Sequence, residues 1–176
     1  SYLIAPNPLV MMAPRNHPLA GKKNISMEEI AKEPFIIREP GSGIRDACFK
    51  AFDAKGLRPK VRMELGSNEA IKHAIVGGLG LSVLSLHSLS LEGIDGPIAV
   101  LDVENFPIQR SWYIVVPKGK ELSLVAQTFL EFAVAYEPKI RERMQTMWPA
   151  LKQLLNKPTA PAAKKKIAKK KIAKTK

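Results

Sequence analysis

The sequence predicts an α/β fold in which a mostly parallel sheet is covered by helices. Short apolar segments alternate along the chain with longer segments whose apolar residues recur at helical spacing. Clusters of glycine, proline, serine and asparagine separate the two kinds of segment. This alternation is typical of βαβ units, whose helices cover the faces of a parallel sheet.

The first predicted elements are a strand, a short helix and a second strand. Residues 8–13 form a continuous apolar run, which favours a buried strand. Ser26 and Glu29 have the spacing of a capping box, and Pro34 prevents the helix that starts there from continuing. Residues 35–38 then predict a strand that ends at a glycine-rich turn.

Two amphipathic helices with a strand between them follow. An apolar stripe starting at Ile44 predicts a helix that ends near Gly56. Apolar and charged residues alternate over residues 61–65, as in a half-buried strand. The second helix is expected to begin after Ser67, its N-cap, and to end at residues 77–78.

The remaining elements of the body are three predicted strands and a helix with an apolar face. The strands are expected at residues 79–84, 98–103 and 112–116, and the helix at residues 122–135. After Pro138, residues 139–156 favour a separate helical extension.

The turn after strand 35–38 is the most informative candidate site. Backbone N–H groups at a helix start lack internal partners and lie at the positive end of the helix dipole, so they attract anionic oxygens. Glycines let a ligand approach the backbone, a serine adds a hydroxyl, and an arginine offers a bidentate fork. The candidate residues are Arg38, Glu39, Gly41, Ser42, Gly43, Ile44 and Arg45. The alternative is a purely structural βα turn with two solvated arginines.

Ser67 and Asn68 repeat this arrangement after the next strand. In open α/β sheets, ligands bind beyond the carboxyl ends of the strands, so the two turns could line one cleft. The alternative is that these residues only cap their helix.

Signals of catalysis and cofactor binding are missing. The sequence lacks a phosphate-binding loop of the Gly-x-x-x-x-Gly-Lys type and a complete dinucleotide fingerprint. The histidines lack metal-ligand spacing, and Cys48 lies in an apolar stripe, where a buried and inert thiol is expected. We therefore predict no catalytic residue, no metal and no cofactor.

The positive charge is concentrated at the carboxyl-terminal end. Of the formal charge of +12, nine lysines in residues 157–176 carry +9, which leaves +3 on residues 1–156. Repelling lysines with few large apolar groups cannot offset the entropy of ordering, so this tail is expected to be disordered. The candidate contacts to nucleic acid are Lys164, Lys165, Lys166, Lys169, Lys170 and Lys171. A solubilising extension is the alternative.

The apolar runs are too short to span a membrane. The first residues lack the basic and apolar regions of a signal peptide, and the single cysteine excludes an internal disulfide. These features favour a soluble, cytoplasmic protein.

Four motifs stand in order along the chain, at residues 14–19 (PRNHPL), 34–43 (PFIIREPGSG), 63–72 (MELGSNEAIK) and 78–85 (GLGLSVLS). Taken together, they resemble LysR-type transcriptional regulators, and in particular the subgroup that controls the Calvin-cycle (RuBisCO) operon. The resemblance covers roughly residues 2–136.

The resemblance implies the fold of type 2 periplasmic binding proteins, with two α/β subdomains and a cleft between them. It implies one complete subdomain and part of the other. Residues 1–7 would form a hinge crossing, residues 8–108 the complete second subdomain and residues 109–136 the returning part of the first. Residues 137–156 would follow as a helical extension. The lysine tail of residues 157–176 departs from the usual family pattern, which ends shortly after the last helix.

The resemblance also implies the partners. Members of this subgroup respond to phosphorylated metabolites or nucleotides such as ribulose bisphosphate, phosphoenolpyruvate or NADPH. They bind DNA through an N-terminal helix-turn-helix, which is expected to be missing from this sequence, and they form tetramers. The two turns, with Arg38 and Arg45, would then bind the anionic effector and favour a closed arrangement of the subdomains.

Two other classes remain open at this point. A solute-binding lobe of a transporter shares the fold and the anion-binding turns, and it would carry an export signal. An enzyme on a similar two-lobed fold would turn over a phosphorylated metabolite.

Overall fold

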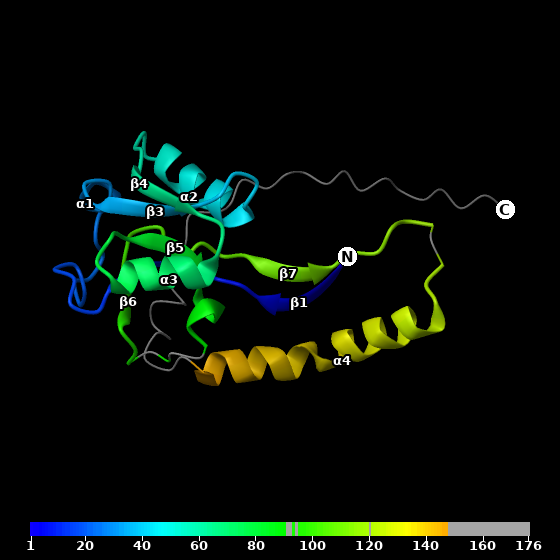
Figure 1. Ribbon diagram of the computed structural model, residues 1–176. Coiled ribbons are helices and arrows are strands. Elements are labelled where there is room, and N and C mark those ends of the chain that lie inside the picture. Colours follow the sequence, from blue (N-terminus) through cyan, green and yellow to red (C-terminus); the bar gives the residue numbers. More distant parts are fainter. Residues whose placement is uncertain (91–92, 94, 120, 148–176) are drawn as a thin grey trace.

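The computed structural model describes residues 1–90, 93, 95–119 and 121–147, which form a mixed α/β structure (Figure 1). Its elements, in chain order, are β1 (Tyr2–Pro6), β2 (Leu9–Pro14), α1 (Met27–Ile30), β3 (Pro34–Arg38), α2 (Gly43–Asp53), β4 (Lys60–Leu65), α3 (Asn68–Val76), β5 (Ser82–Ser85), the 3₁₀ turn η1 (Leu86–Leu89), β6 (Ile98–Leu101), β7 (Ser111–Ile114) and α4 (Leu124–Met147). The expected strands and helices of residues 8–116 are therefore present, with small shifts at their ends.

β2 is buried along its whole length because its side chains enter two separate hydrophobic clusters. Successive side chains of a strand point to opposite faces of the sheet. Leu9 and Met11 pack in a cluster that also contains side chains of α1 and α2. Val10 and Met12 pack in a second cluster that contains side chains of α3. The apolar run of residues 8–13 is thus explained by helices on both faces.

The expectation of a mostly parallel sheet is wrong for the central strand. β2 runs antiparallel to β5 on one side and to β6 on the other. The segment that contains α1 reverses the chain between β2 and β3, so it is not a crossover connection. The apolar pattern of a strand is the same whichever way its neighbours run, so the sequence did not reveal this direction.

β3 and β4 form the parallel part of the fold. Backbone bonds join this pair to the strand that leads into β5, because Leu81 N donates to Pro34 O and Ile36 N donates to Leu81 O, both at 2.8 Å. β3, β4 and this strand therefore run in the same direction. Their carboxyl ends lie at one edge of the sheet, where the two predicted turns begin.

β1 and β7 pair antiparallel, apart from the other sheets, and α4 lies alongside β1 (Figure 1). α4 continues through Pro138 to Met147. The expectation that one helix ends near residue 135 and another begins at 139 is therefore wrong. Proline removes one intrahelical hydrogen bond, and this loss is tolerated here because Pro138 and Val134 are exposed to water. The rest of the expected extension and the lysine tail lie outside the described residues.

Candidate functional site

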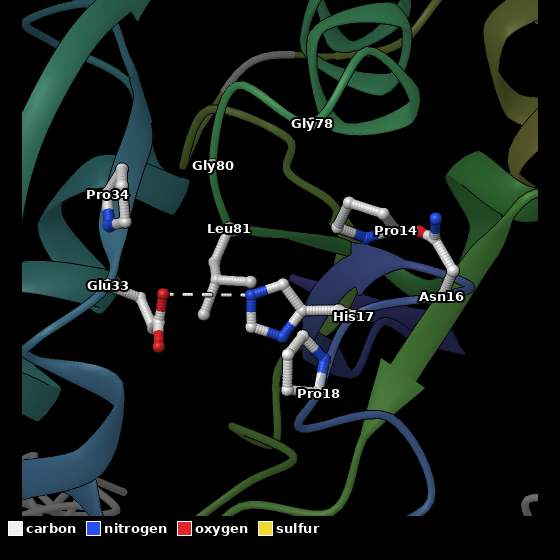
Figure 2. Close-up of a pocket in the computed structure, with 9 residues that line it drawn as sticks. All are labelled: Pro14, Asn16, His17, Pro18, Glu33, Pro34, Gly78, Gly80 and Leu81. Atoms are coloured by element: carbon white, nitrogen blue, oxygen red, sulfur yellow. Dashed lines mark ion pairs between the residues drawn. The ribbon is translucent and has the colours of Figure 1, made fainter.

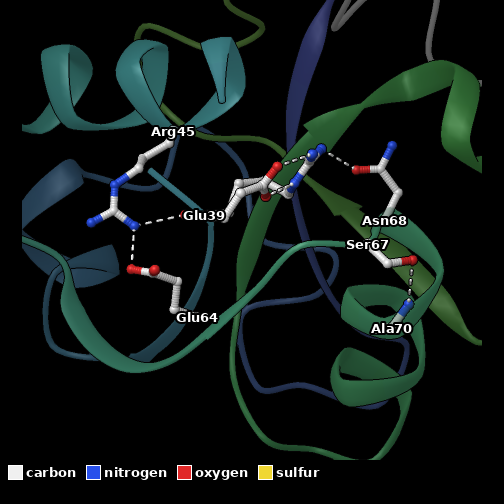
Figure 3. A network of polar contacts seen from close by, with 7 residues as sticks. Glu39, Arg45, Glu64, Ser67, Asn68 and Ala70 are labelled. Atoms are coloured by element: carbon white, nitrogen blue, oxygen red, sulfur yellow. Dashed lines mark hydrogen bonds and ion pairs between the residues drawn. The ribbon is translucent and has the colours of Figure 1, made fainter. Parts of the chain in front are cut away.

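The two predicted turns lie side by side at the carboxyl ends of β3 and β4 (Figure 3). Arg38, the last residue of β3, joins them directly. Its Nη1 donates a 2.7 Å hydrogen bond to Oδ1 of Asn68, the first residue of α3. The structure thus brings together candidate residues that are thirty positions apart in the chain.

Arg38 also forms a bidentate pair with its neighbour Glu39. Arg38 Nε donates to Glu39 Oε2 at 2.6 Å, and Nη2 donates to Oε1 at 2.8 Å. The hydrogen bond from Arg38 lowers the pKa of Glu39, and the same bond raises the pKa of Arg38. Glu39 therefore stays ionised and occupies the fork that an anionic ligand would use.

Arg45, in the first half of α2, is held in a similar way. Its Nη1 donates to the carbonyl of Arg38 at 2.7 Å and to Oε2 of Glu64 on β4 (Figure 3). Its guanidinium also lies over the ring of Phe49, 5.1 Å from the ring centroid. Sequence reasoning missed Glu64, which was seen only as a charged residue in an alternating strand.

The helix start at α2 is less completely capped than the one at α3. Ser67 Oγ accepts a hydrogen bond from the backbone N–H of Ala70 at 3.4 Å, whereas the Ser42 side chain makes no capping bond. Gly41 has a φ of +87°, a left-handed conformation that favours glycine. The Ser42 hydroxyl and the first turn of α2 are thus open to a ligand. Ile44 differs from the other candidates, because its side chain packs against the hydrophobic cluster.

Arg110 also contacts the candidate site, and sequence reasoning missed it. It precedes β7, and its Nη1 donates a 2.7 Å hydrogen bond to the carbonyl of Gly43 at the start of α2. A Cβ atom on Gly43 would lie 3.6 Å from both terminal nitrogens of this guanidinium. No local pattern marks Arg110, because the chain returns to the turn only through tertiary structure.

A pocket of about 270 Å³ lies at the other end of β3, beyond Pro34 (Figure 2). The imidazole of His17 projects into it, and His17 Nε2 lies 3.7 Å from Oε2 of Glu33. His17 Nδ1 accepts a hydrogen bond from the backbone N–H of Leu19 at 3.2 Å. The motif of residues 14–19 therefore lines this pocket and does not approach the two turns.

The Cys48 thiol is buried, as its place in an apolar stripe predicted. His73 is exposed on α3. Burial raises the pKa of the Cys48 thiol to about 12, so this cysteine is a poor nucleophile at neutral pH. Within the part of the chain that the structure describes, no three histidine, cysteine, aspartate or glutamate side chains gather as metal ligands. None of the helices described combines the length and apolarity needed to cross a bilayer.

Polar turns at the carboxyl ends of adjacent parallel strands are typical of α/β domains that bind small molecules. The family comparison agrees with this class. Residues 1–137 match the model of the LysR substrate binding domain, and the chain belongs to this family.

The relatives are transcriptional regulators by their names, and one of them is named for the RuBisCO operon. The chain is 55% identical over 134 residues to the HTH-type transcriptional activator CmpR of Synechocystis sp. This match covers 76% of this chain and 44% of CmpR. It is 47% identical over 131 residues to the RuBisCO operon transcriptional regulator of Acidithiobacillus ferrooxidans. That match covers 74% of this chain and 42% of the regulator. The chain thus spans less than half the length of these curated relatives.

A solved structure of high similarity is the CcmR regulatory domain of Synechocystis in complex with 2-PG. It superposes with a TM-score of 0.76 at 47% sequence identity, over 79% of this chain and 67% of that one. The chain therefore has the type 2 periplasmic-binding-like fold of LysR effector-binding domains, as the motifs implied. CcmR shows that a regulatory domain of this family binds a small-molecule effector.

Proposed function

We propose that this chain is the effector-sensing region of a LysR-type DNA-binding transcriptional regulator that controls carbon-fixation genes. The observation that supports this most strongly is the 47% identity to the CcmR regulatory domain, which was solved with 2-PG bound. The name of one relative, the RuBisCO operon transcriptional regulator, supports the link to carbon fixation, and the name of the activator CmpR supports a role in transcription.

The effector we propose is a small phosphorylated anion bound at the turns after β3 and β4. Support comes from the contact between Arg38 and Asn68, which joins the turns, and from the Ser42 hydroxyl, which makes no capping hydrogen bond to α2. Because Glu39 and Glu64 already hold Arg38 and Arg45, an anion must displace these carboxylates or bind beside them. An anion that displaces the carboxylates changes the contacts within both turns, whereas one that binds beside them leaves both ion pairs in place.

We further propose that residues 1–7 and the segment after residue 108 are the two crossings of a hinge between subdomains. In this scheme residues 8–108 form one subdomain and residues 109–136 part of the other. Asn7 N donates to the carbonyl of Arg110 at 2.7 Å, and β1 pairs with β7, so the two segments lie side by side. An effector that binds the closed arrangement more tightly than the open one shifts the population toward closure.

In this proposal the whole regulator binds DNA through a separate helix-turn-helix and forms a homo-oligomer, which we expect to be a tetramer. It acts in the cytoplasm and is not an enzyme. Support comes from membership in a family whose relatives are named as transcriptional regulators. The buried Cys48 and exposed His73 agree with this assignment, since neither has the environment of a catalytic group.

The test is a calorimetric titration of the full-length protein with 2-PG, followed by DNA footprinting with and without this ligand. Ser42→Ala should weaken 2-PG binding about tenfold, because a hydrogen bond to a charged group is lost. Arg45→Ala should weaken both binding and the effect of 2-PG on the footprint.

Matched controls are Ser90→Ala, at an exposed serine after η1, and Arg58→Ala, at an exposed arginine paired with Asp53. Both controls should bind 2-PG as the natural protein does. If Ser42→Ala and Arg45→Ala also left affinity and footprint unchanged, the effector would bind elsewhere.

A further inference from the structure

Both arginines of the two turns are paired with a carboxylate. Arg38 is paired with Glu39, and Arg45 is paired with Glu64, at contacts that include both carboxylate oxygens of Glu39. Each pair has a net charge of zero. Arg38 and Arg45 therefore position the turns, but they add little net attraction for an anion.

Arg110 differs from both of these arginines. Its side chain is exposed, and its contact within the described residues is the single hydrogen bond from Nη1 to the Gly43 carbonyl. Across residues 1–90, 93, 95–119 and 121–147 it has no carboxylate partner, so its charge is not neutralised. The Nε and Nη2 groups keep free donor capacity beside the turn that contains Ser42.

The backbone of Arg110 is anchored, which fixes the origin of this side chain. Its carbonyl accepts a 2.7 Å hydrogen bond from Asn7 N. Asn7 in turn is held by Ser85, whose Oγ donates to Asn7 Oδ1. The guanidinium therefore reaches α2 from a hydrogen-bonded segment of a different part of the chain, and this anchoring reduces the freedom that is lost when a ligand is bound.

We infer that Arg110 is the residue that selects for negative charge in the candidate effector site, where its free N–H groups bind the phosphoryl or carboxylate oxygens of a small dianion. This inference rests on the proposed function. A planar fork with unused donors suits two oxygens of a phosphoryl group, and a lysine would offer the charge without the fork.

The experiment measures binding of 2-PG and of inorganic phosphate to the full-length protein and three variants, over a series of salt concentrations. Arg110→Gln should weaken 2-PG binding about 10- to 100-fold and reduce its dependence on salt. Arg110→Lys should recover part of the affinity and most of the salt dependence. The matched control is Arg62→Gln, because Arg62 is also exposed and donates to one backbone carbonyl, that of Leu79, at 3.3 Å.

Thermal unfolding of each variant separates loss of the fold from loss of the contact. Equal affinity and equal salt dependence of 2-PG binding for Arg110→Gln and the natural protein would overturn the role of Arg110 and leave the proposed function intact. A natural protein that bound neither 2-PG nor phosphate would overturn both. A loss for Arg110→Gln that Arg110→Lys did not recover, at unchanged melting temperature, would assign the effect to the Gly43 contact and overturn charge selection.

Discussion

Glu39 controls how accessible the Arg38 fork is to an incoming anion. Its two carboxylate oxygens occupy Nε and Nη2 of Arg38, and the third contact of this guanidinium is to Asn68. Because the hydrogen bond from Arg38 lowers the pKa of Glu39, mild acidification does not remove this negative charge. Replacing the side chain is therefore the clearer way to test its effect.

Glu39→Gln should strengthen 2-PG binding about threefold to tenfold, because it removes a like charge and frees donors of Arg38. Titration calorimetry measures the change. Glu33→Gln is the matched control, since Glu33 precedes the opposite end of β3 and should leave the affinity unchanged. A weaker affinity for Glu39→Gln would instead mean that Glu39 orients Arg38 for the ligand.

Among the elements, the contact between β3 and the strand leading into β5 depends on Gly80. A Cβ atom at this position would lie 2.5 Å from the carbonyl oxygen of Pro34, which is closer than real side chains approach. That same oxygen accepts the hydrogen bond from Leu81 N at 2.8 Å. The missing side chain of Gly80 thus permits the contact that joins the parallel strands to the antiparallel sheet.

Gly80→Ala should destabilise the protein by about 1–3 kcal/mol, because the two backbones must move apart. Thermal or urea unfolding measures the loss. Gly66→Ala is the control, since a Cβ there meets no atom within 4 Å. Equal stability of the two variants would show that the contact relaxes without loss.

For the molecule as a whole, most of the formal charge of +12 lies in residues 157–176, outside the described residues. The body carries only +3 and holds several of its arginines in ion pairs. We propose that effector recognition belongs to the body, and that the tail supplies affinity for DNA that does not depend on base sequence.

Deleting residues 157–176 should reduce the slope of log affinity against log salt for DNA binding, because fewer counterions are released. Fluorescence anisotropy with a DNA duplex, at several salt concentrations, measures this slope. A variant with glutamine at the six candidate lysines of the tail keeps the length and should show a similar reduction. An unchanged slope in both would favour a solubilising extension.

Features that depend on neighbouring residues could be predicted from the sequence. The caps formed by Ser26 and Ser67, the strand of residues 8–13 and the turn after β3 follow from short-range spacing. The four motifs also indicated the family that the comparison confirmed. These features are local, because hydrogen bonds of caps and the alternation of a strand involve residues only a few positions apart.

Tertiary structure alone decided the direction of β2, the contacts of Arg38 with Asn68 and of Arg45 with Glu64, and the position of Arg110 at the start of α2. Arg45 meets Glu64 across 19 positions, Arg38 meets Asn68 across 30, and Arg110 meets Gly43 across 67. Polar contacts at such separations depend on how the strands are ordered, and a polar residue carries no local mark of its distant partner. The sequence by itself indicated the two turns at which we propose that an anion binds. Only the fold decided that Arg110 lies beside them and, within the described residues, has no carboxylate partner.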